Sequence, residues 1–151
     1  MYIHWKKEYE TGQPLIDAEH RILVMLFRKL DVAIKTKESE ASINRIVLEV
    51  SKFVEFHFIS EENLMYETNY PGIGGHKALH MKLLKELNDM VTKLTKRREF
   101  PDDLLYFLSD WLYNHIAHHD QLLARHVEEA NDRPVAELIY PEYLQAIAQD
   151  Q

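Results

Sequence analysis

The sequence predicts an all-α protein: an up-down-up-down antiparallel four-helix bundle with a short N-terminal arm and a C-terminal helical extension. Three observations lead to this prediction. Apolar side chains recur every three or four residues in four long segments, the period of a helix with one buried face. Short breaks separate these segments, which favours antiparallel neighbours. The chain of 151 residues has only 4 Gly and 5 Pro, too few for a turn-rich, multi-stranded fold.

An irregular arm is expected over residues 1–16, because Gly12 and Pro14 interrupt any regular pattern. A first helix is predicted from Asp17, a suitable N-cap, to about Lys37. Its apolar stripe includes one histidine: Ile16, His20, Leu23, Val24, Phe27, Leu30 and Ile34. Such a stripe is expected to face the centre of the bundle.

A second helix is predicted over about 41–67, with Ser39 or Ser42 as its N-cap and the turn residues 69–72 at its end. Its stripe carries a histidine and a glutamate: Ile46, Val50, Phe53, Val54, His57, Phe58, Glu61, Leu64 and Met65. A third helix is predicted over about 76–97. Its stripe carries two histidines: His76, Leu79, His80, Leu83, Leu84, Leu87, Met90, Val91 and Leu94.

A fourth helix is predicted over about 102–130, where Pro101 suits a helix start. The residues expected to point inward are Leu104, Leu105, Leu108, Trp111, Leu112, His115, Leu122 and Leu123. The polar segment 131–134 ends this helix. We therefore expect one domain over 1–131, the bundle with its arm, and an extension over 132–151 that forms a short amphipathic helix against it.

Charge and composition argue against several classes of protein. Lys and Arg number 18 against 25 Asp and Glu, a net charge of −7 that disfavours binding to nucleic acid or to an anionic membrane surface. The chain has no Cys, which excludes disulfides, iron–sulfur clusters and thiolate zinc sites. It has no apolar run long enough to span a membrane and no apolar signal core at its N-terminus, so we expect a cytoplasmic protein.

Histidine is frequent, with 9 in the chain, and five of these lie on the apolar stripes: His20, His57, His76, His80 and His115. Glu61 follows His57 by four residues, and His80 follows His76 by the same interval. Four residues return a helix to within about 40° of the starting direction, so each pair points at one spot. A lone histidine on such a stripe is usually a hydrogen-bonded core residue. Burying this many polar groups would cost several kcal/mol unless strong partners were present, and a metal site resolves that cost.

The spacing on the fourth helix does not by itself identify the partner of His115. Five residues turn a regular helix by about 140°, which points Asp120 away from His115. His119, four residues on, is better placed, and His118 is also close. Asp120 would fit if its carboxylate reached sideways or if a π-bulge brought the fifth residue onto the same face.

The donor set of imidazoles and carboxylates without thiolate suits iron, zinc or manganese, and seven such ligands suit two ions that share carboxylates. His126 is interpreted as a packing residue. Three acidic residues are candidates either for the surface, which is the default, or for a position that supports a metal ligand: Asp17, Glu19 and Glu62.

The complete set of spacings resembles the signature of the hemerythrin family. That signature has one histidine on the first helix, HxxxE on the second, HxxxH on the third and HxxxxD on the fourth. The matching residues, in the same order, are His20, His57 and Glu61, His76 and His80, and His115 and Asp120. The resemblance covers about residues 3–130. Trp5, Gly12 and the segment 16–20 are similar to the corresponding part of single-domain bacterial hemerythrins.

The resemblance implies a role for each matching residue. Three histidines would bind one iron ion: His76, His80 and His115. His20 and His57 would bind a second iron ion and leave it an open position for dioxygen. Glu61 and Asp120 would bridge the two ions together with an oxo or hydroxo group. Leu112 would help to enclose the oxygen pocket.

The function implied is reversible binding of dioxygen for transport, storage or buffering, without enzymatic activity. One alternative is a sensor of oxygen, iron or redox state, or an interaction module. Only the apolar residues of the C-terminal segment favour it: Tyr140, Tyr143, Leu144 and Ile147. Another alternative is a di-iron enzyme of peroxidase or oxidase type, although the sequence shows no polar groups for a substrate at the open iron.

Overall fold

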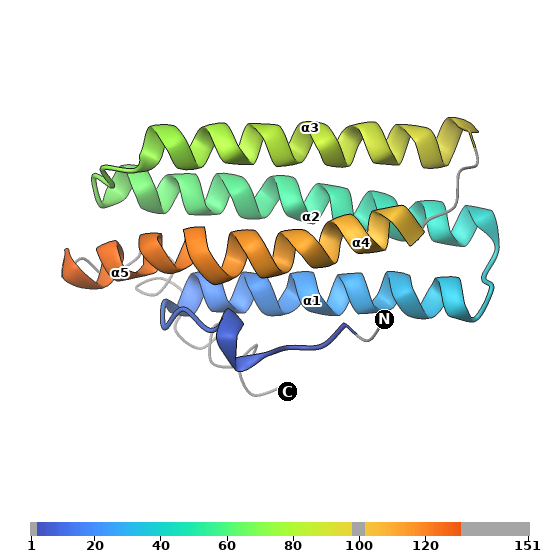
Figure 1. Cartoon of the computed structure of the whole chain (residues 1–151), viewed down its shortest axis with the longest axis horizontal. Coiled ribbons are helices and arrows are strands. Elements are labelled where there is room, and N and C mark those ends of the chain that lie inside the picture. The colour runs from blue at the N-terminus through green and yellow to red at the C-terminus, as the bar shows by residue number, and fades with distance from the viewer. Residues whose placement is uncertain (1–2, 98–101, 131–151) are drawn as a thin grey trace.

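The computed structural model describes residues 3–97 and 102–130, apart from the side chains of Arg97, Asp102, Asp103 and Leu112. These residues form four antiparallel helical rods, shown side by side in Figure 1. The first three rods are α1 (Pro14–Lys35), α2 (Glu40–Glu67) and α3 (Ile73–Arg97). The fourth is continuous but has three parts, α4 (Asp102–Trp111), η2 (Leu112–Asp120) and α5 (Gln121–Glu129). A short 3₁₀ turn, η1 (Lys7–Tyr9), precedes the bundle. The predicted fold class is confirmed.

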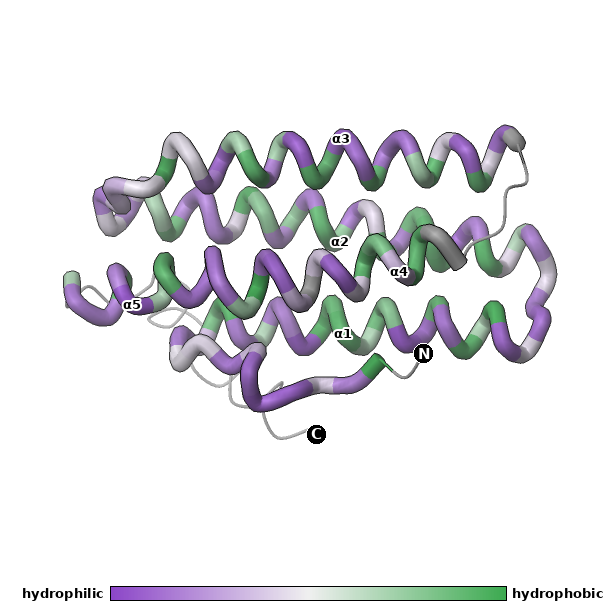
Figure 2. The backbone as a smooth tube through the Cα atoms, viewed as in Figure 1, coloured by the Kyte–Doolittle hydropathy of each residue, from purple (hydrophilic) through white to green (hydrophobic). Residues whose placement is uncertain are grey.

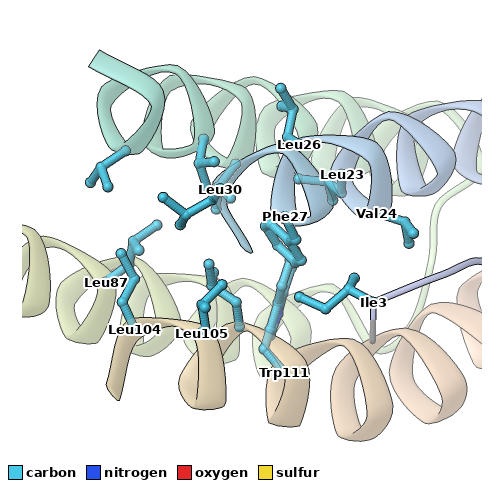
Figure 3. Packing of buried hydrophobic residues seen from close by; sticks show 14 of the residues in the cluster. Ile3, Leu23, Val24, Leu26, Phe27, Leu30, Leu87, Leu104, Leu105 and Trp111 are labelled. Carbon is cyan, nitrogen blue, oxygen red and sulfur yellow. The ribbon is translucent and has the colours of Figure 1, made fainter. Parts of the chain in front are cut away.

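Apolar side chains fill most of the space between the rods. Figure 2 shows apolar and polar residues alternating along every rod, as amphipathic helices require. The larger cluster of buried apolar residues joins all four rods and is shown in part in Figure 3; its members include Leu30, Phe27, Leu87, Leu104 and Leu105. A smaller cluster lies at the other end of the bundle and contains Ile16, Leu64, Met65, Leu123, Ala124 and Val127.

The start of α1 differs from the prediction. Gln13, not Asp17, is the N-cap, and its side-chain oxygen accepts a 2.7 Å hydrogen bond from the backbone N–H of Ile16. Pro14 occupies the first turn, where its missing N–H costs nothing. Asp17 instead secures the arm, because its carboxylate accepts hydrogen bonds from the backbone N–H groups of Thr11 at 2.8 Å and Gly12 at 2.9 Å. Gly12 has φ +85°, a conformation that favours glycine.

The structure confirms the expected N-cap of α2 but not the expected burial of Leu122. Ser39 is the N-cap of α2 and accepts a hydrogen bond from the Ser42 N–H at 3.2 Å. Leu122 was expected to point inward but is 53% exposed. The π-helical segment η2 just before it adds residues per turn and shifts the register, so that Leu122 faces solvent, while Leu123, also expected to point inward, is buried together with Val127.

The extension predicted over 132–151 lies outside the described residues, and the division of the chain at 131 stays a prediction. No helix within the described residues is long and apolar enough to cross a membrane. The cytoplasmic location also stays a prediction.

Candidate metal centre

The bundle contains a layer of buried polar side chains between its two apolar clusters. All seven predicted ligands lie in this layer, and none is more than 6% exposed: His20, His57, Glu61, His76, His80, His115 and Asp120. They come from α1, α2, α3 and η2, so every rod contributes at least one. The inward stripes of four packed helices therefore bring together side chains that are up to 100 positions apart in the sequence.

The seven side chains form two overlapping groups, and within each group one ligand atom per residue lies within 4.8 Å of all the others. One group contains three histidines with both carboxylates: His76, His80 and His115 with Glu61 and Asp120. The other contains two histidines with the same two carboxylates: His20 and His57 with Glu61 and Asp120. The carboxylates are thus common to both groups.

Glu61 turns one oxygen toward each group. Its Oε1 lies 3.1 Å from His57 Nε2 and 3.4 Å from His20 Nε2. Its Oε2 lies 3.1 Å from His80 Nε2 and 3.5 Å from His76 Nε2. A carboxylate with this orientation can bridge two cations, one on each side.

Asp120 has the same arrangement from the opposite rod. Its Oδ2 lies 2.9 Å from His20 Nε2, and its Oδ1 lies 3.1 Å from both His76 Nε2 and His115 Nε2. The π-helical segment η2 makes this possible, because i→i+5 hydrogen bonding brings the fifth residue after His115 onto the same face. His119, which regular spacing favours, is exposed. Of the two ways in which Asp120 could join His115, a carboxylate that reaches sideways or a π-helical backbone, the structure has the π-helical backbone.

Acidic residues outside the seven orient two of the histidines. Glu19 Oε1 accepts from His57 Nδ1 at 3.0 Å, and Ser60 Oγ donates to Glu19 Oε2 at 2.7 Å. Glu62 Oε1 accepts from His80 Nδ1 at 3.1 Å. With the proton on Nδ1, the Nε2 lone pair of each ring points into the cluster, which is the arrangement typical of metal-binding histidines.

The default surface position was wrong for Glu19, which is 4% exposed, and Glu62 is half-buried. The sequence did contain a signal for Glu19, because it lies three residues after Ile16 and four before Leu23, on the inward face. His126 points elsewhere, and its Nε2 donates to the Thr68 carbonyl at 2.7 Å.

Aromatic side chains cover the three-histidine group. Phe58 stacks on His80 with ring centroids 3.9 Å apart, and Trp111 stacks on His115 at 5.8 Å. Both aromatic residues are buried and belong to the larger apolar cluster. They hold the imidazoles of His80 and His115 in place.

The two carboxylates of the cluster are held in their ionised form. Burial raises the pKa of Glu61, but the neighbouring imidazoles, His57 first, outweigh burial and hold the pKa well below its usual value. Burial and Glu61 raise the pKa of Asp120, yet His115 and His20 lower it overall. Burial lowers the pKa of His76, but Asp120 and Glu61 raise it to about 9. Both carboxylates thus stay ionised in the interior, where they attract cations.

The donor atoms of the cluster fit a metal. Several of them are buried without a hydrogen bond of normal geometry, although they lie close together: both oxygens of Glu61 and of Asp120, and Nε2 of His76, His80 and His115. Unpartnered buried polar atoms cost free energy, and cations placed among them would satisfy these lone pairs. Imidazole and carboxylate donors without thiolate suit iron, zinc or manganese.

Comparison with known proteins agrees with this geometry. The sequence model of one family, described as the hemerythrin HHE cation binding domain, matches residues 11–127. The chain belongs to the hemerythrin family. The match begins in the arm and ends in α5, so this hemerythrin domain takes in all four rods and all seven residues of the cluster.

Individual hemerythrins show the same relationship over most of their length. The chain is 32% identical to a bacteriohemerythrin of Stenotrophomonas maltophilia over 124 residues, which cover 82% of this chain and 80% of that protein. It is also 32% identical to a bacteriohemerythrin of Methylococcus capsulatus, over 76% of this chain and 88% of the other. The crystal structure of a leucine-to-alanine mutant of hemerythrin superposes with a TM-score of 0.74 at 27% identity, and the match covers 84% of this chain and 98% of that one.

Proposed function

We propose that this protein binds dioxygen reversibly at a pair of iron ions and serves in the transport, storage or buffering of oxygen. The observation that carries the proposal is the orientation of Glu61 and Asp120, each of which turns one oxygen toward a three-histidine group and the other toward a two-histidine group. Two ions with shared carboxylates match this arrangement. In this proposal all seven residues are ligands.

The unequal number of histidines supports a binding position on one side only. Three histidines and two carboxylates surround one ion, whereas His20 and His57 are the only imidazoles of the second group within the described residues. When bound, the iron pair would supply an open coordination position and electrons for reversible dioxygen binding. The place for dioxygen is therefore on the side of His20 and His57.

The residues of the chain have distinct tasks in this proposal. Glu19 and Glu62 fix the Nδ1 protons of His57 and His80, which keeps both Nε2 lone pairs directed at the ions. Apolar residues around the layer, among them Leu23, Phe58 and Ile116, are buried and limit access of water. A dry lining favours release of intact dioxygen over irreversible oxidation of the iron.

Spectroscopy on the iron-loaded protein tests the proposal. The reduced protein, mixed with dioxygen without any reductant, should develop a visible absorption band that disappears on removal of oxygen and returns over repeated cycles. Elemental analysis should give two iron ions per chain, and zinc-loaded protein should show no band. A single irreversible change, or sustained consumption of oxygen with an added reductant, would support an oxidase or peroxidase instead.

Leu112 is proposed to line the oxygen pocket. Its backbone begins η2, three residues before His115, while its side chain lies outside the described part of the structure. If it guards the pocket, Leu112→Ala should shorten the lifetime of the dioxygen-dependent band at a temperature well below melting. Equal lifetimes in the variant and the parent would leave it without this role.

A further inference from the structure

A cleft of about 160 Å³ opens between α3 and the fourth rod, on the side of the three-histidine group. Its buried lining includes Trp111 and His115, which are 4% and 2% exposed. Four polar residues belong to its exposed or half-exposed part, Glu86, Asp110, Asn114 and His119, and the half-exposed Leu79, Leu83 and Phe107 form an apolar wall beside them. The cleft therefore connects solvent with one of the candidate ligands.

His115 is the inner end of this connection. Neither of its ring nitrogens has a hydrogen bond of normal geometry, although the ring is buried. Its Nε2 lies 3.1 Å from Asp120 Oδ1, inside the cluster. A solute that reaches the bottom of the cleft thus meets a member of the cluster, whose imidazole separates it from Asp120.

His119 lies between solvent and this inner end. Its ring centroid is 5.6 Å from that of His115 and 6.3 Å from that of His76, and its side chain is exposed. Its ring is close enough to bind an ion together with a residue of the cluster. His119 nevertheless belongs to neither of the two groups that the seven residues form. His119, the neighbour of Asp120 in η2, thus offers a metal-binding imidazole that the metal centre itself does not require.

We propose that this cleft is the path by which ferrous ions reach and leave the three-histidine group, and that His119 is a transient ligand along it. Glu86 and Asp110 at the opening would raise the local concentration of divalent cations. An imidazole outside the cluster would replace one water ligand before the ion reaches His115, so that the ion need not lose its hydration shell in one step. The proposal rests on the proposed function only in taking the cluster as an iron site.

Exchange kinetics test this path without dioxygen. Release is measured anaerobically from the iron-loaded protein to a coloured ferrous chelator, and uptake is measured with Co²⁺ and metal-free protein by visible absorption. His119→Ala, and the double variant Glu86→Gln with Asp110→Asn, should slow both processes roughly tenfold. The final metal content should equal that of the parent, because a path changes rates and not the equilibrium.

Matched controls use residues outside the cleft. His118→Ala removes the neighbouring exposed imidazole, and Glu128→Gln removes an exposed carboxylate of α5. Both should exchange metal at the parental rate. Leu83→Trp fills the cleft from its apolar wall and should slow exchange without any change in charge.

Each remaining outcome has a definite meaning. If His119→Ala exchanges metal as fast as His118→Ala, the path proposed here is wrong. If His119→Ala lowers the final metal content, His119 is a permanent ligand, which also overturns the proposal. Reversible dioxygen binding is measured separately on fully loaded protein, so normal dioxygen binding with unaltered exchange rates would refute the path alone. Slowed exchange without reversible dioxygen binding would refute the proposed function alone.

Discussion

Two layers of the same bundle differ in how they contribute to stability. In the half of the bundle shown in Figure 3, the inward positions of the helices carry leucine, valine and phenylalanine, which stabilise the fold by packing against one another. A few turns along the same helices, equivalent inward positions carry histidine, glutamate and aspartate. The comparison teaches that one helical period can build either a core or a site, depending on the side chains placed on it.

The energetic consequences are opposite in sign. Each buried Val, Leu, Ile or Phe side chain contributes about 1.5–3 kcal/mol relative to leaving it exposed. Each buried polar atom without a partner costs about 1–3 kcal/mol. The polar layer is therefore held in place by the apolar clusters on both sides of it, and it becomes favourable only when cations occupy it.

The largest effect is expected from Asp120→Ala, which removes a carboxylate common to both histidine groups. We expect loss of stable di-iron binding, because each ion loses a ligand and the bridge loses half of its carboxylate oxygens. The melting temperature of the variant in the presence of iron should fall to about that of the metal-free protein. Elemental analysis and thermal unfolding measure both effects.

The control for this variant is the neighbouring His119→Ala. It removes an exposed side chain and should leave the final iron content and the melting temperature unchanged. If instead His119→Ala lost the iron and Asp120→Ala kept it, the regular helical spacing would have been the better guide to the ligands.

In the apolar layer, Leu108→Ala should cost about 2–5 kcal/mol of unfolding free energy. Leu108 is 1% exposed and belongs to the larger cluster, so its truncation leaves a cavity. The loss should be the same with and without metal, because the cavity lies outside the polar layer. Urea unfolding of both forms measures it, with Leu48→Ala, an exposed leucine of α2, as the neutral control. A loss seen only in the metal-loaded form would show that the two layers are coupled.

The sequence predicted the bundle because periodicity is a property of neighbouring residues, and most of the inward residues on each stripe are indeed buried or half-buried. It was less reliable where structure depends on hydrogen bonds between separate segments. Asp17 has the chemistry of an N-cap, but it accepts hydrogen bonds from the arm instead. For Glu19 the surface was the default and a position supporting a ligand the alternative, because its partners, His57 and Ser60, are provided by another helix.

The backbone of η2 was the feature least accessible to sequence reasoning. Regular geometry turns Asp120 away from His115, and only the resemblance to hemerythrins favoured it. A π-helical segment forms where tertiary packing outweighs the preference for regular α-helical hydrogen bonds. Local sequence propensity therefore does not predict where such a segment lies. The resemblance carried information about tertiary structure that residue spacing did not contain.

A smaller effect than that of Leu108 is expected where a residue acts only through a ligand. Glu19→Gln keeps the size of the side chain but weakens the acceptor for His57 Nδ1, and we expect a roughly 10–100-fold loss of metal affinity. Glu62→Gln should have a weaker effect, because Glu62 is half-buried and water can replace it. Competition with a chelator measures the affinity, with Glu49→Gln on the outer face of α2 as control. Equal affinity in Glu19→Gln and the parent would reduce Glu19 to a packing role.

The smallest effect is expected from deletion of Ala117, which tests the explanation given for η2. Deletion shortens the interval between His115 and Asp120 from five residues to four, the interval that a regular α-helix places on one face. The segment should become α-helical, return both side chains to the cluster and retain two iron ions, with a change in unfolding free energy of about 1 kcal/mol or less. Insertion of one alanine after Ala117 is the matched opposite, because six residues turn Asp120 away and the iron should be lost. Iron content and melting temperature of the two variants distinguish the outcomes. Loss of iron on deletion as well as on insertion would show that the metal centre needs the π-helical backbone itself and not merely the direction it gives to Asp120.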